Sequence, residues 1–563
     1  MGLEATAPMA AAAPEAPAAA PRPAPMARRA GAPAILALAL YAAAGAVGTW
    51  FVFEPTLASR FALLQTYPGD PLLTCYFLEH ELRVVERRDH VGTFWSPPFY
   101  YPAPHVLAYS ENLMGMLPFY ALLRLRWDPG TSYQLLLILM CVLDYAAMLL
   151  VLRRLGVGPP LATLGAFFFA FSAPRQAQLG HLQLFPVFYV PLSLWALWRL
   201  LAAPGRGRLA LLLLLLYLQL LSVIYVGWFL LLTFGLAVPL LLFWDRDGRR
   251  RLAAFCRSAP RFVTLSLAAW AAAYYVVLRP YIAARAELGE RSWNEVLIFL
   301  PRLKSWLAVL PGSTYQSLLP DFPRTPGNWE HHHLFPGLVP IALGVASAVY
   351  TLRLSRQERR RQALLVTCWI AAIALAVVSL VVPRFAFDGL HVVKADPGVS
   401  LWWLVFRWVP GAGAIRAVVW ISILIFALAA VAACWGADAA IRRLRVRPAV
   451  RAALLAALLL AGVAEQRIDS PPAFGKQPFF DRVAAVRASI PRGCHALYLT
   501  RQPGVSYVVT QLVAMWAGLD AQVPVINGYS GFFPPRYPRS QKTWSAAELR
   551  AWSGDDPCVV SQW

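Results

Sequence analysis

Long apolar runs alternate with short polar connections along most of the chain. A helix of about 20 apolar residues, rising 1.5 Å per residue, is long enough to cross a hydrocarbon core of ~30 Å. The pattern predicts about 11 spans, and they lie at 33–53, 133–152, 160–174, 184–202, 209–223, 225–244, 262–280, 335–353, 364–382, 416–436 and 451–466. The fold class expected is therefore an α-helical polytopic membrane protein.

Two stretches depart from the pattern of spans. Residues 1–30 are rich in Ala and Pro, which predicts a disordered cytoplasmic tail. The run 113–124 is too short to cross the membrane and contains Pro118, so we expect a helix lying at the outer interface. The run 33–53 could also be a cleaved signal peptide, but it exceeds the usual apolar core of about 7–15 residues, so we expect an uncleaved first span.

Composition supports a membrane protein and excludes two other classes. Hydrophobic residues make up 59% of the 563 positions, charged residues 14%, and the mean hydropathy is +0.53. These values exclude a soluble globular enzyme and a disordered chain. The net charge is +22, but the arginines cluster between apolar runs, as in cytoplasmic loops, so no nucleic-acid partner is expected. The scarcity of lysine beside abundant Ala and Arg fits a GC-rich bacterial source.

The arginine clusters also predict the sidedness of the chain. With 113–124 at the interface, the basic connections share the side of the N-terminus, which the positive-inside rule assigns to the cytoplasm. We therefore expect a multi-pass protein of the bacterial inner membrane whose transmembrane domain covers 31–466. Its long outer loops are 54–132, 281–334 and 383–415, and its C-terminus is periplasmic. These outer segments hold most of the Trp, Tyr, His and acidic residues, so polar chemistry is expected there.

The last segment, 467–563, has a different pattern from the spans. HALYLT (495–500) and VPVIN (523–527) resemble strands, and the run from 505 to 518 resembles a helix. This predicts a small extracytoplasmic α/β domain. Cys494 and Cys558 could form a disulfide there, because the periplasm is oxidising. No cysteine spacing resembles a zinc site.

Two acidic residues of the first outer loop are candidates for catalysis. Asp70 lies between Gly69 and Pro71, just before an amphipathic helix, so its carboxylate could cap that helix. At the outer face it could instead accept a proton from a sugar hydroxyl or bind a divalent ion, Mg²⁺ or Mn²⁺. Glu111 could complement a helix dipole, or it could join Asp70 in holding an acceptor or metal.

A second group lies between two predicted spans and consists of four polar residues: Arg175, Gln178, His181 and Gln183. The first three are spaced by three residues, so one helical face could present them together. An arginine at the outer boundary suits a phosphate through paired hydrogen bonds. It could equally contact ordinary lipid headgroups.

Two further clusters lie before later spans. Glu330 precedes three consecutive histidines, 331 to 333, of which at most two could share one tetrahedral metal site. His332 is our candidate for substrate binding, and a plain interfacial loop is the alternative. Arg416 follows a Gly-rich turn and could neutralise a phosphate leaving group, although simple headgroup contact is equally compatible with its position.

Several motifs together resemble one family. GDPLL (69–73) and FYYPAPHVLAYSENLMG (99–115) are followed in order by FSAPRQAQLGHLQL (171–184), LFPGLVP (334–340), PGAGAIRA (410–417) and VPVINGYSGFFP (523–534). This order resembles bacterial multispanning proteins related to GT-C glycosyltransferases. The resemblance implies a polyprenyl-phosphate sugar donor, chemistry at the outer face, inversion at the anomeric carbon and Asp70 at the catalytic position. Unlike the usual acidic pair, the turn holds one convincing acid.

The leading hypothesis is a GT-C-like membrane glycosyltransferase, a hexosyl- or pentosyltransferase of the cell envelope. It would transfer a sugar from a polyprenyl-phosphate donor to a glycan, lipid or protein acceptor, with Asp70 as base or metal ligand. One alternative is a transporter or flippase of lipid-linked sugars, which should show buried charges at mid-membrane. Asp144 is the main acid of that kind. Another is a non-catalytic relative that handles envelope polysaccharide.

Overall fold

The structure is a computed structural model that describes residues 32–88, 91–319, 329–354, 359–381, 400–538, 543–561 and 563. The predicted N-terminal tail, 1–30, and much of the predicted outer loop 383–415 lie outside the described residues. Within them, each predicted apolar run coincides with a helix. These helices are α1 (Ala32–Ala58), α4 (Pro129–Arg154), α5 (Pro159–Phe171), α7 (Tyr189–Ala202), α8 (Arg206–Ser222), α9 (Ile224–Trp244), α11 (Pro260–Leu288), α13 (Leu338–Leu352), α14 (Arg359–Ser379), α16 (Ser422–Arg442) and α17 (Pro448–Ala464).

The helices form the bundle expected of a polytopic membrane protein. By length and composition, 7 helical stretches of the described chain could cross a membrane, and α13 and α17 are shorter apolar helices. The candidate span that contains α16 is 94% buried and packs against α5, α13 and α14, so it forms the centre of the bundle. The candidate span in α11 is only 11% buried, as expected of a helix that faces lipid.

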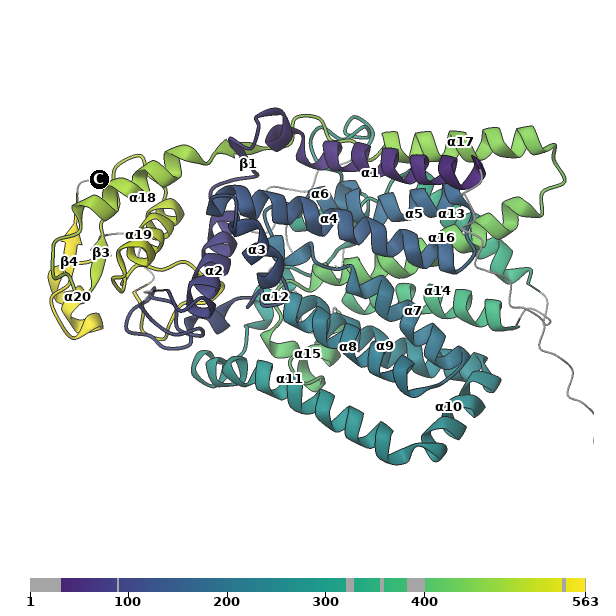
Figure 1. The fold of residues 1–563 in the computed structure, drawn as a ribbon, viewed down its shortest axis with the longest axis horizontal. Coiled ribbons are helices and arrows are strands. Elements are labelled where there is room, and N and C mark those ends of the chain that lie inside the picture. Colours follow the sequence, from purple (N-terminus) through teal and green to yellow (C-terminus); the bar gives the residue numbers. More distant parts are fainter. Residues whose placement is uncertain are drawn as a thin grey trace, which may run out of the picture.

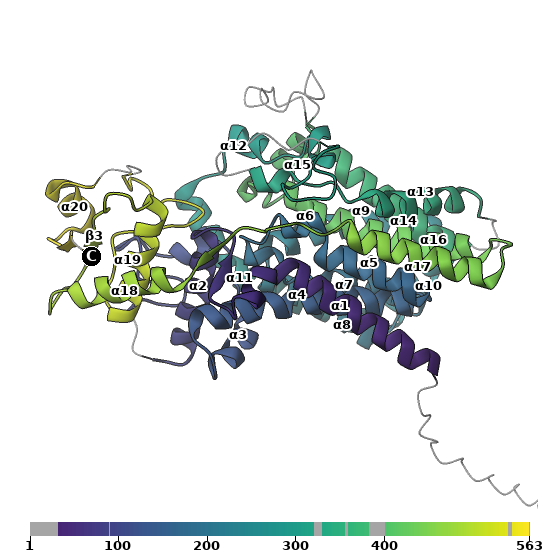
Figure 2. The same ribbon diagram turned by 90° about the horizontal axis from the view of Figure 1, so that it is seen from above.

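The two ends of the bundle differ in charge and content. α10 (Arg246–Ser258) is a basic helix between α9 and α11, and it lies at the end of the bundle where α1 begins (Figures 1 and 2). The arginine-rich connection between α16 and α17 lies at the same end. The C-terminal elements lie at the opposite end. The basic connections and the C-terminal segment therefore occupy opposite ends, as the charge pattern predicted.

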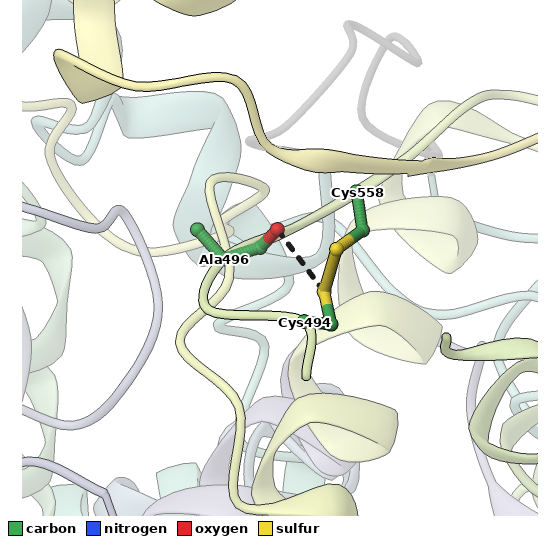
Figure 3. Close-up of a disulfide and its surroundings, with 3 residues drawn as sticks. All are labelled: Cys494, Ala496 and Cys558. Atoms are coloured by element: carbon green, nitrogen blue, oxygen red, sulfur yellow. Dashed lines mark hydrogen bonds between the residues drawn. A yellow bond between two sulfur atoms is a disulfide. The ribbon is translucent and has the colours of Figure 1, made fainter. Parts of the chain in front are cut away.

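The C-terminal segment combines short strands with helices. Its elements are β2 (Ala473–Gly475), α18 (Gln477–Ser489), β3 (Leu497–Leu499), α19 (Tyr507–Ala521), α20 (Ala546–Ser553) and β4 (Cys558–Val560). β2 pairs antiparallel with β1 (Leu63–Gln65) of the segment predicted as the first outer loop, and β3 pairs in parallel with β4. The segment is therefore attached to the first outer loop through a shared ladder. Cys494 and Cys558 form a disulfide that joins the approach to β3 with the start of β4 (Figure 3).

The first outer loop contains two helices, α2 (Asp70–Val85) and α3 (Leu117–Arg124). α3 has eight residues, so the stretch expected at the interface does form a helix that is too short to cross. Its N-terminal part, 113–116, precedes the helix.

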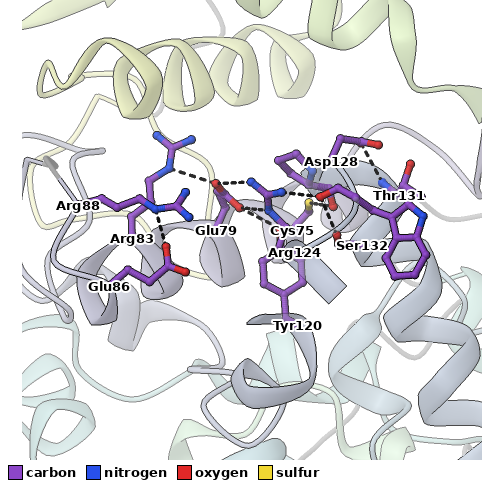
Figure 4. Close-up of polar contacts among 12 residues, drawn as sticks. Cys75, Glu79, Arg83, Glu86, Arg88, Tyr120, Arg124, Asp128, Thr131 and Ser132 are labelled. Atoms are coloured by element: carbon purple, nitrogen blue, oxygen red, sulfur yellow. Dashed lines mark hydrogen bonds and ion pairs between the residues drawn. The ribbon is translucent and has the colours of Figure 1, made fainter. Parts of the chain in front are cut away.

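A buried carboxylate fixes α2 in place (Figure 4). Glu79 accepts hydrogen bonds from Nε of Arg124 at 2.9 Å, Nε of Arg83 at 3.2 Å and the hydroxyl of Tyr120 at 3.1 Å. Arg83 also donates to Asp520 in α19 at 2.7 Å. Because the Glu79 side chain is 1% exposed, these partners replace the water that the charge loses on burial. The network joins α2 to α3 and α19, and it therefore positions Asp70 at the start of α2.

We expect the disulfide to stabilise the C-terminal segment. It closes a chain separation of 64 residues. Replacing Cys494 and Cys558 together with Ser should lower the free energy of unfolding of this segment by about 2–4 kcal/mol, because the unfolded chain regains loop freedom. Limited proteolysis across a temperature series would measure the change. Cys256→Ser, at an exposed free cysteine, is the control, and equal protease resistance of the double variant and the control would contradict the prediction.

Candidate active site

Asp70 opens α2 without capping it. The N-cap residue is Gly69, and among the described residues no side chain makes a capping hydrogen bond to this helix. One carboxylate oxygen of Asp70 accepts a hydrogen bond from the hydroxyl of Tyr529 at 2.8 Å. The other lies 3.0 Å from Nδ1 of His181. The capping interpretation is therefore wrong, and the carboxylate faces two functional side chains from distant parts of the chain.

His181 connects Asp70 to a second carboxylate. Its Nε2 lies 3.8 Å from Oε1 of Glu330, and Nε2 of His331 lies 3.9 Å from the same oxygen. The imidazole rings of His181 and His331 stack with centroids 4.9 Å apart. Three segments thus meet at one point: the start of α2, the 177–184 turn, and the short helix η4 (Trp329–His332).

Two more side chains fix the orientation of this cluster. Nδ1 of His331 lies 2.9 Å from Oε1 of Gln178 and 3.2 Å from Nε1 of Trp420. Nε2 of Gln178 donates to the carbonyl oxygen of Glu330 at 3.0 Å. Gln178 therefore contacts both neighbours of His181, which are His331 and Glu330.

The charges of the cluster alternate. Burial by itself would raise the pKa of Asp70, but the contact with His181, the Tyr529 hydrogen bond and the charge of Arg416 lower it below its ordinary value. Burial would likewise raise the pKa of Glu330, but His181 and His331 lower it to about 2. Burial opposes the charged form of His181, yet its contacts with Asp70 and Glu330 raise its pKa to about 9. The three groups are therefore an imidazolium between two carboxylates at neutral pH.

The pKa of His331 is shifted in the opposite direction from that of His181. Burial and the neighbouring positive charge of His181 lower the pKa of His331 well below its ordinary value, so its ring is neutral. The cluster consequently offers ionised carboxylates, one cation and one neutral imidazole. The side chains of Asp70 and Glu330 remain 23% and 22% exposed, so both carboxylates are open to a ligand.

Arg416 lies at the edge of the cluster. Its side chain is 37% exposed and its NH1 lies 3.6 Å from Glu295 of α12 (Trp293–Ile298). Its guanidinium carbon lies 5.0 Å from the centre of the Phe299 ring. The charge of Arg416 contributes to lowering the pKa of Asp70, as a cation near a carboxylate does.

Arg175, predicted to bind phosphate, occupies a buried structural position. NH2 of Arg175 donates to Asp144 of α4 at 2.9 Å, and its NH1 donates to the carbonyl oxygen of Leu184 at 2.6 Å. The side chains of Arg175 and Asp144 are 5% and 0% exposed. The other Asp144 oxygen accepts the backbone N–H of Val187 at 3.1 Å. The pair thus holds the turn that carries His181, and this guanidinium is not presented to a ligand.

Glu111 and His332 also serve the scaffold. Glu111 accepts hydrogen bonds from the backbone N–H groups of Ile224 at 2.7 Å and Tyr225 at 3.2 Å, so it caps α9. Burial raises the pKa of Glu111 to about 7 despite these hydrogen bonds. The ring of His332 is fully buried, with Nδ1 2.9 Å from the hydroxyl of Ser305 and Nε2 3.1 Å from the carbonyl oxygen of Ile298.

Gln183 is buried in the short helix η2 (Leu182–Leu184), and within the described chain its Oε1 has no hydrogen-bond partner. The sequence does not single out Trp420 or Tyr529 as members of this cluster. For Glu330 and His331 a signal exists, because they begin the acidic and histidine-rich motif before the predicted span at 335–353.

Two apolar hollows lie along the bundle. One, of about 700 Å³, lies between α5, α13, α14 and α16, with Trp306 and Pro336 among its lining residues. The other, of about 550 Å³, follows α9 from Trp228 to Leu236 and is also lined by Val409. Hollows of this composition suit hydrocarbon chains rather than polar ligands.

Part of the cluster could hold a divalent metal. One ligand atom each from His181, Glu330 and His331 lie within 4.8 Å of one another. Two imidazole nitrogens and a carboxylate fit Zn²⁺ or Mn²⁺ by ligand type, whereas Mg²⁺ prefers oxygen ligands. Asp70 faces Nδ1 of His181, so it would orient a ligand rather than supply one.

No family model and no curated protein matches the chain. Among solved structures, the fold is similar to the apo oligosaccharyltransferase of Archaeoglobus fulgidus, with 12% identity and a TM-score of 0.48 over 87% of this chain and 64% of that one. It is also similar to the arabinofuranosyltransferase AftD from Mycobacteria, with 16% identity and a TM-score of 0.46 over 87% of this chain and 31% of that one. A third is apo ArnT from Cupriavidus metallidurans, with 12% identity and a TM-score of 0.42 over 88% and 86%.

The chain thus spans less than two thirds of the length of the first two similar structures. Glycosyltransferases are among the matches, as the sequence resemblance to GT-C proteins predicted.

The buried ion pair predicts a large cost for single substitutions. Arg175→Leu should lower the free energy of unfolding by about 3–5 kcal/mol, because Asp144 would remain buried without its cation. The double variant Asp144→Leu/Arg175→Leu should recover much of this loss. Denaturant-dependent unfolding in detergent would measure both. A single variant as stable as the wild type would contradict the structural role of the pair.

The His181 cluster predicts a pH-dependent stability. A histidine with a pKa of about 9 in the folded protein stabilises it fully below its unfolded value of about 6.5, and this contribution is lost as the pH rises through 9. Asp70 and Glu330, with lowered pKa values, lose their contribution as the pH falls below their unfolded values near about 4. The cluster should therefore stabilise most between about pH 5 and 6.5.

Thermal unfolding in chelator-containing buffer would test this. The difference in midpoint between the wild type and His181→Asn should be largest near pH 6 and should shrink towards pH 10. His495→Asn, at an exposed histidine of the C-terminal segment, is the control. A difference that does not change with pH would show that His181 is neutral in the folded protein.

Proposed function

We propose that this protein is a membrane glycosyltransferase that moves a sugar from a polyprenyl-phosphate donor to a hydroxyl acceptor at the outer face of the bacterial inner membrane. The observation that carries the proposal is the ionised, partly exposed carboxylate of Asp70, held between Tyr529 and the His181 imidazolium. A fixed carboxylate at the water-facing end of an apolar bundle suits proton abstraction from a sugar hydroxyl.

The proposed reaction proceeds with Asp70 as the general base. The acceptor hydroxyl loses its proton to Asp70 while its oxygen forms a bond to the anomeric carbon of the donor sugar. The bond between that carbon and the phosphate oxygen breaks, and polyprenyl phosphate leaves with the electron pair. Inversion at the anomeric carbon is what the family resemblance implies for this displacement.

Arg416 is placed to neutralise the leaving phosphate. Its partly exposed guanidinium lies at the edge of the cluster, and a cation there stabilises the charge that develops as the bond breaks. Gln178 and His181 hold the geometry around Asp70, and the apolar hollows beside the bundle suit the lipid chain of the donor. The proposed orientation has a cytoplasmic N-terminus and an outer C-terminal segment, which the opposite placement of α10 and α19 supports.

A divalent ion is compatible with this proposal. His181, Glu330 and His331 would hold it, after His181 loses a proton. Such an ion supplies positive charge to polarise a bound hydroxyl or phosphate oxygen. Asp70 would keep its role, because its carboxylate contacts the opposite nitrogen of His181.

The contacts of Asp144 weaken the transporter alternative. A transport pathway at mid-membrane should present an ionisable group to a cavity. Asp144 instead has both oxygens occupied, by Arg175 and by the backbone of Val187.

Asp70→Asn tests the proposal. This change keeps the size of the side chain and removes the base, so transfer should fall by about 100-fold or more. Consumption of lipid-linked sugar by the purified variant in proteoliposomes would be measured. Asp481→Asn, at an exposed aspartate of α18, is the matched control and should retain full activity. Normal turnover by Asp70→Asn would remove Asp70 from the mechanism.

A further inference from the structure

Two arginines converge on one carboxylate beside the proposed phosphate position. Oε1 of Glu295 lies 2.9 Å from NH1 of Arg291 and 3.6 Å from NH1 of Arg416. The Glu295 side chain is 30% exposed, and that of Arg291 is 8% exposed. Because two cations that share one partner repel each other, an anion between them lowers the cost of holding both in place. In this structure that anion is the carboxylate of Glu295.

Arg291 is held more firmly by its surroundings than Arg416 is. Arg291 donates through NH2 to the carbonyl oxygen of Gly531 at 2.8 Å, and its guanidinium carbon lies 3.1 Å from the centre of the Phe532 ring. Its backbone N–H donates to the carbonyl oxygen of Gly413 at 3.0 Å. Arg291 would therefore keep its place without Glu295. Arg416 has a more exposed side chain, which can move towards a ligand.

The surroundings fit an amphiphile with a phosphate head. The turn that carries Arg416 begins beside the hollow along α9, where Trp228 donates to the carbonyl oxygen of Pro410 at 3.0 Å. Tyr225 of the same helix lies with its hydroxyl 3.4 Å from the backbone nitrogen of Arg416, and its ring packs against Trp420. A chain in this hollow would thus bring its head to the arginine pair, next to the His331 side of the cluster.

We propose that Glu295 is a displaceable internal counter-ion, which occupies the place of the donor phosphate between Arg291 and Arg416 until the donor binds. The inference rests on the proposed function, since it names the residue that the donor displaces. A phosphate offers more charge and more acceptor oxygens than a carboxylate, so it competes effectively for paired guanidinium groups. Glu295 would keep the two cations compensated while the site is empty and would weaken the binding of less charged lipids.

The same geometry links donor binding to the base. Arg291 contacts Gly531, which lies two residues after Tyr529, the hydrogen-bond donor to Asp70. An anion bound to Arg291 would therefore influence the position of the loop whose Tyr529 donates a hydrogen bond to the Asp70 carboxylate. Arg291 is a positioning residue in this scheme, and Glu295 controls access to it.

Equilibrium binding of radiolabelled farnesyl phosphate to the full-length protein in detergent tests the proposal, with binding to protein-free micelles subtracted. Removing a partly exposed competing carboxylate should tighten binding by about threefold to fivefold in Glu295→Gln and in Glu295→Ala. Binding of farnesol, which has no phosphate, should not change. Arg291→Gln and Arg416→Gln should weaken farnesyl phosphate binding by about tenfold.

Glu290→Gln is the matched control. Glu290 lies five residues before Glu295 in the sequence and pairs with Arg285, so this variant removes the same charge from a different ion pair. This variant should change farnesyl phosphate binding by less than about twofold, because an exposed ion pair contributes little energy. Equal or weaker binding by both Glu295 variants would overturn the proposal, because Glu295 would then support the arginines rather than compete with the ligand. The readout is binding without turnover, so this result is separate from the outcome for Asp70→Asn.

Discussion

The structure depends on the pairing of charges at the boundary between an apolar bundle and water. An unpaired charge there is expensive, and several buried carboxylates of the described residues therefore have a cation or several N–H donors. Asp70 and Glu330 share His181, Glu79 has Arg83 and Arg124, and Asp144 has Arg175. Apart from the Glu79–Arg83 pair within α2, these contacts join separate segments of the chain. The polar contacts of the candidate site are therefore also contacts that hold its parts together.

Two of these charge groups have different functions. The Asp144–Arg175 pair is closed, with both partners buried, and it stabilises the turn that carries Gln178 and His181. The Asp70–His181–Glu330 group is open, because its carboxylates remain partly exposed and share one cation, His181. An open group can exchange a partner for a ligand, whereas a closed one cannot without leaving a charge unpaired. This difference separates the catalytic candidate from the scaffold.

The C-terminal segment completes the site although it lies farthest along the chain from Asp70. Tyr529 reaches Asp70, Gly531 binds Arg291, and Trp516 of α19 donates to the carbonyl oxygen of Leu72 at 3.2 Å. The β1–β2 ladder and the Arg83–Asp520 ion pair attach the same segment to the first outer loop. Asp70, its hydrogen-bond donor Tyr529 and the arginine pair thus belong to one assembly at one end of the bundle.

The sequence by itself determined where the apolar helices lie and that the basic connections and the C-terminal segment belong to opposite ends of the bundle, because helix length and charge distribution are local properties of the chain. It also singled out Asp70, Gln178, His181 and Arg416, because each is a polar residue in a short motif beside an apolar run. It did not separate Arg175 from them, and it did not assign Glu330, His331 or Tyr529 to Asp70. Only the tertiary structure decided these, because which charges become partners depends on distances between segments that the chain brings together when it folds.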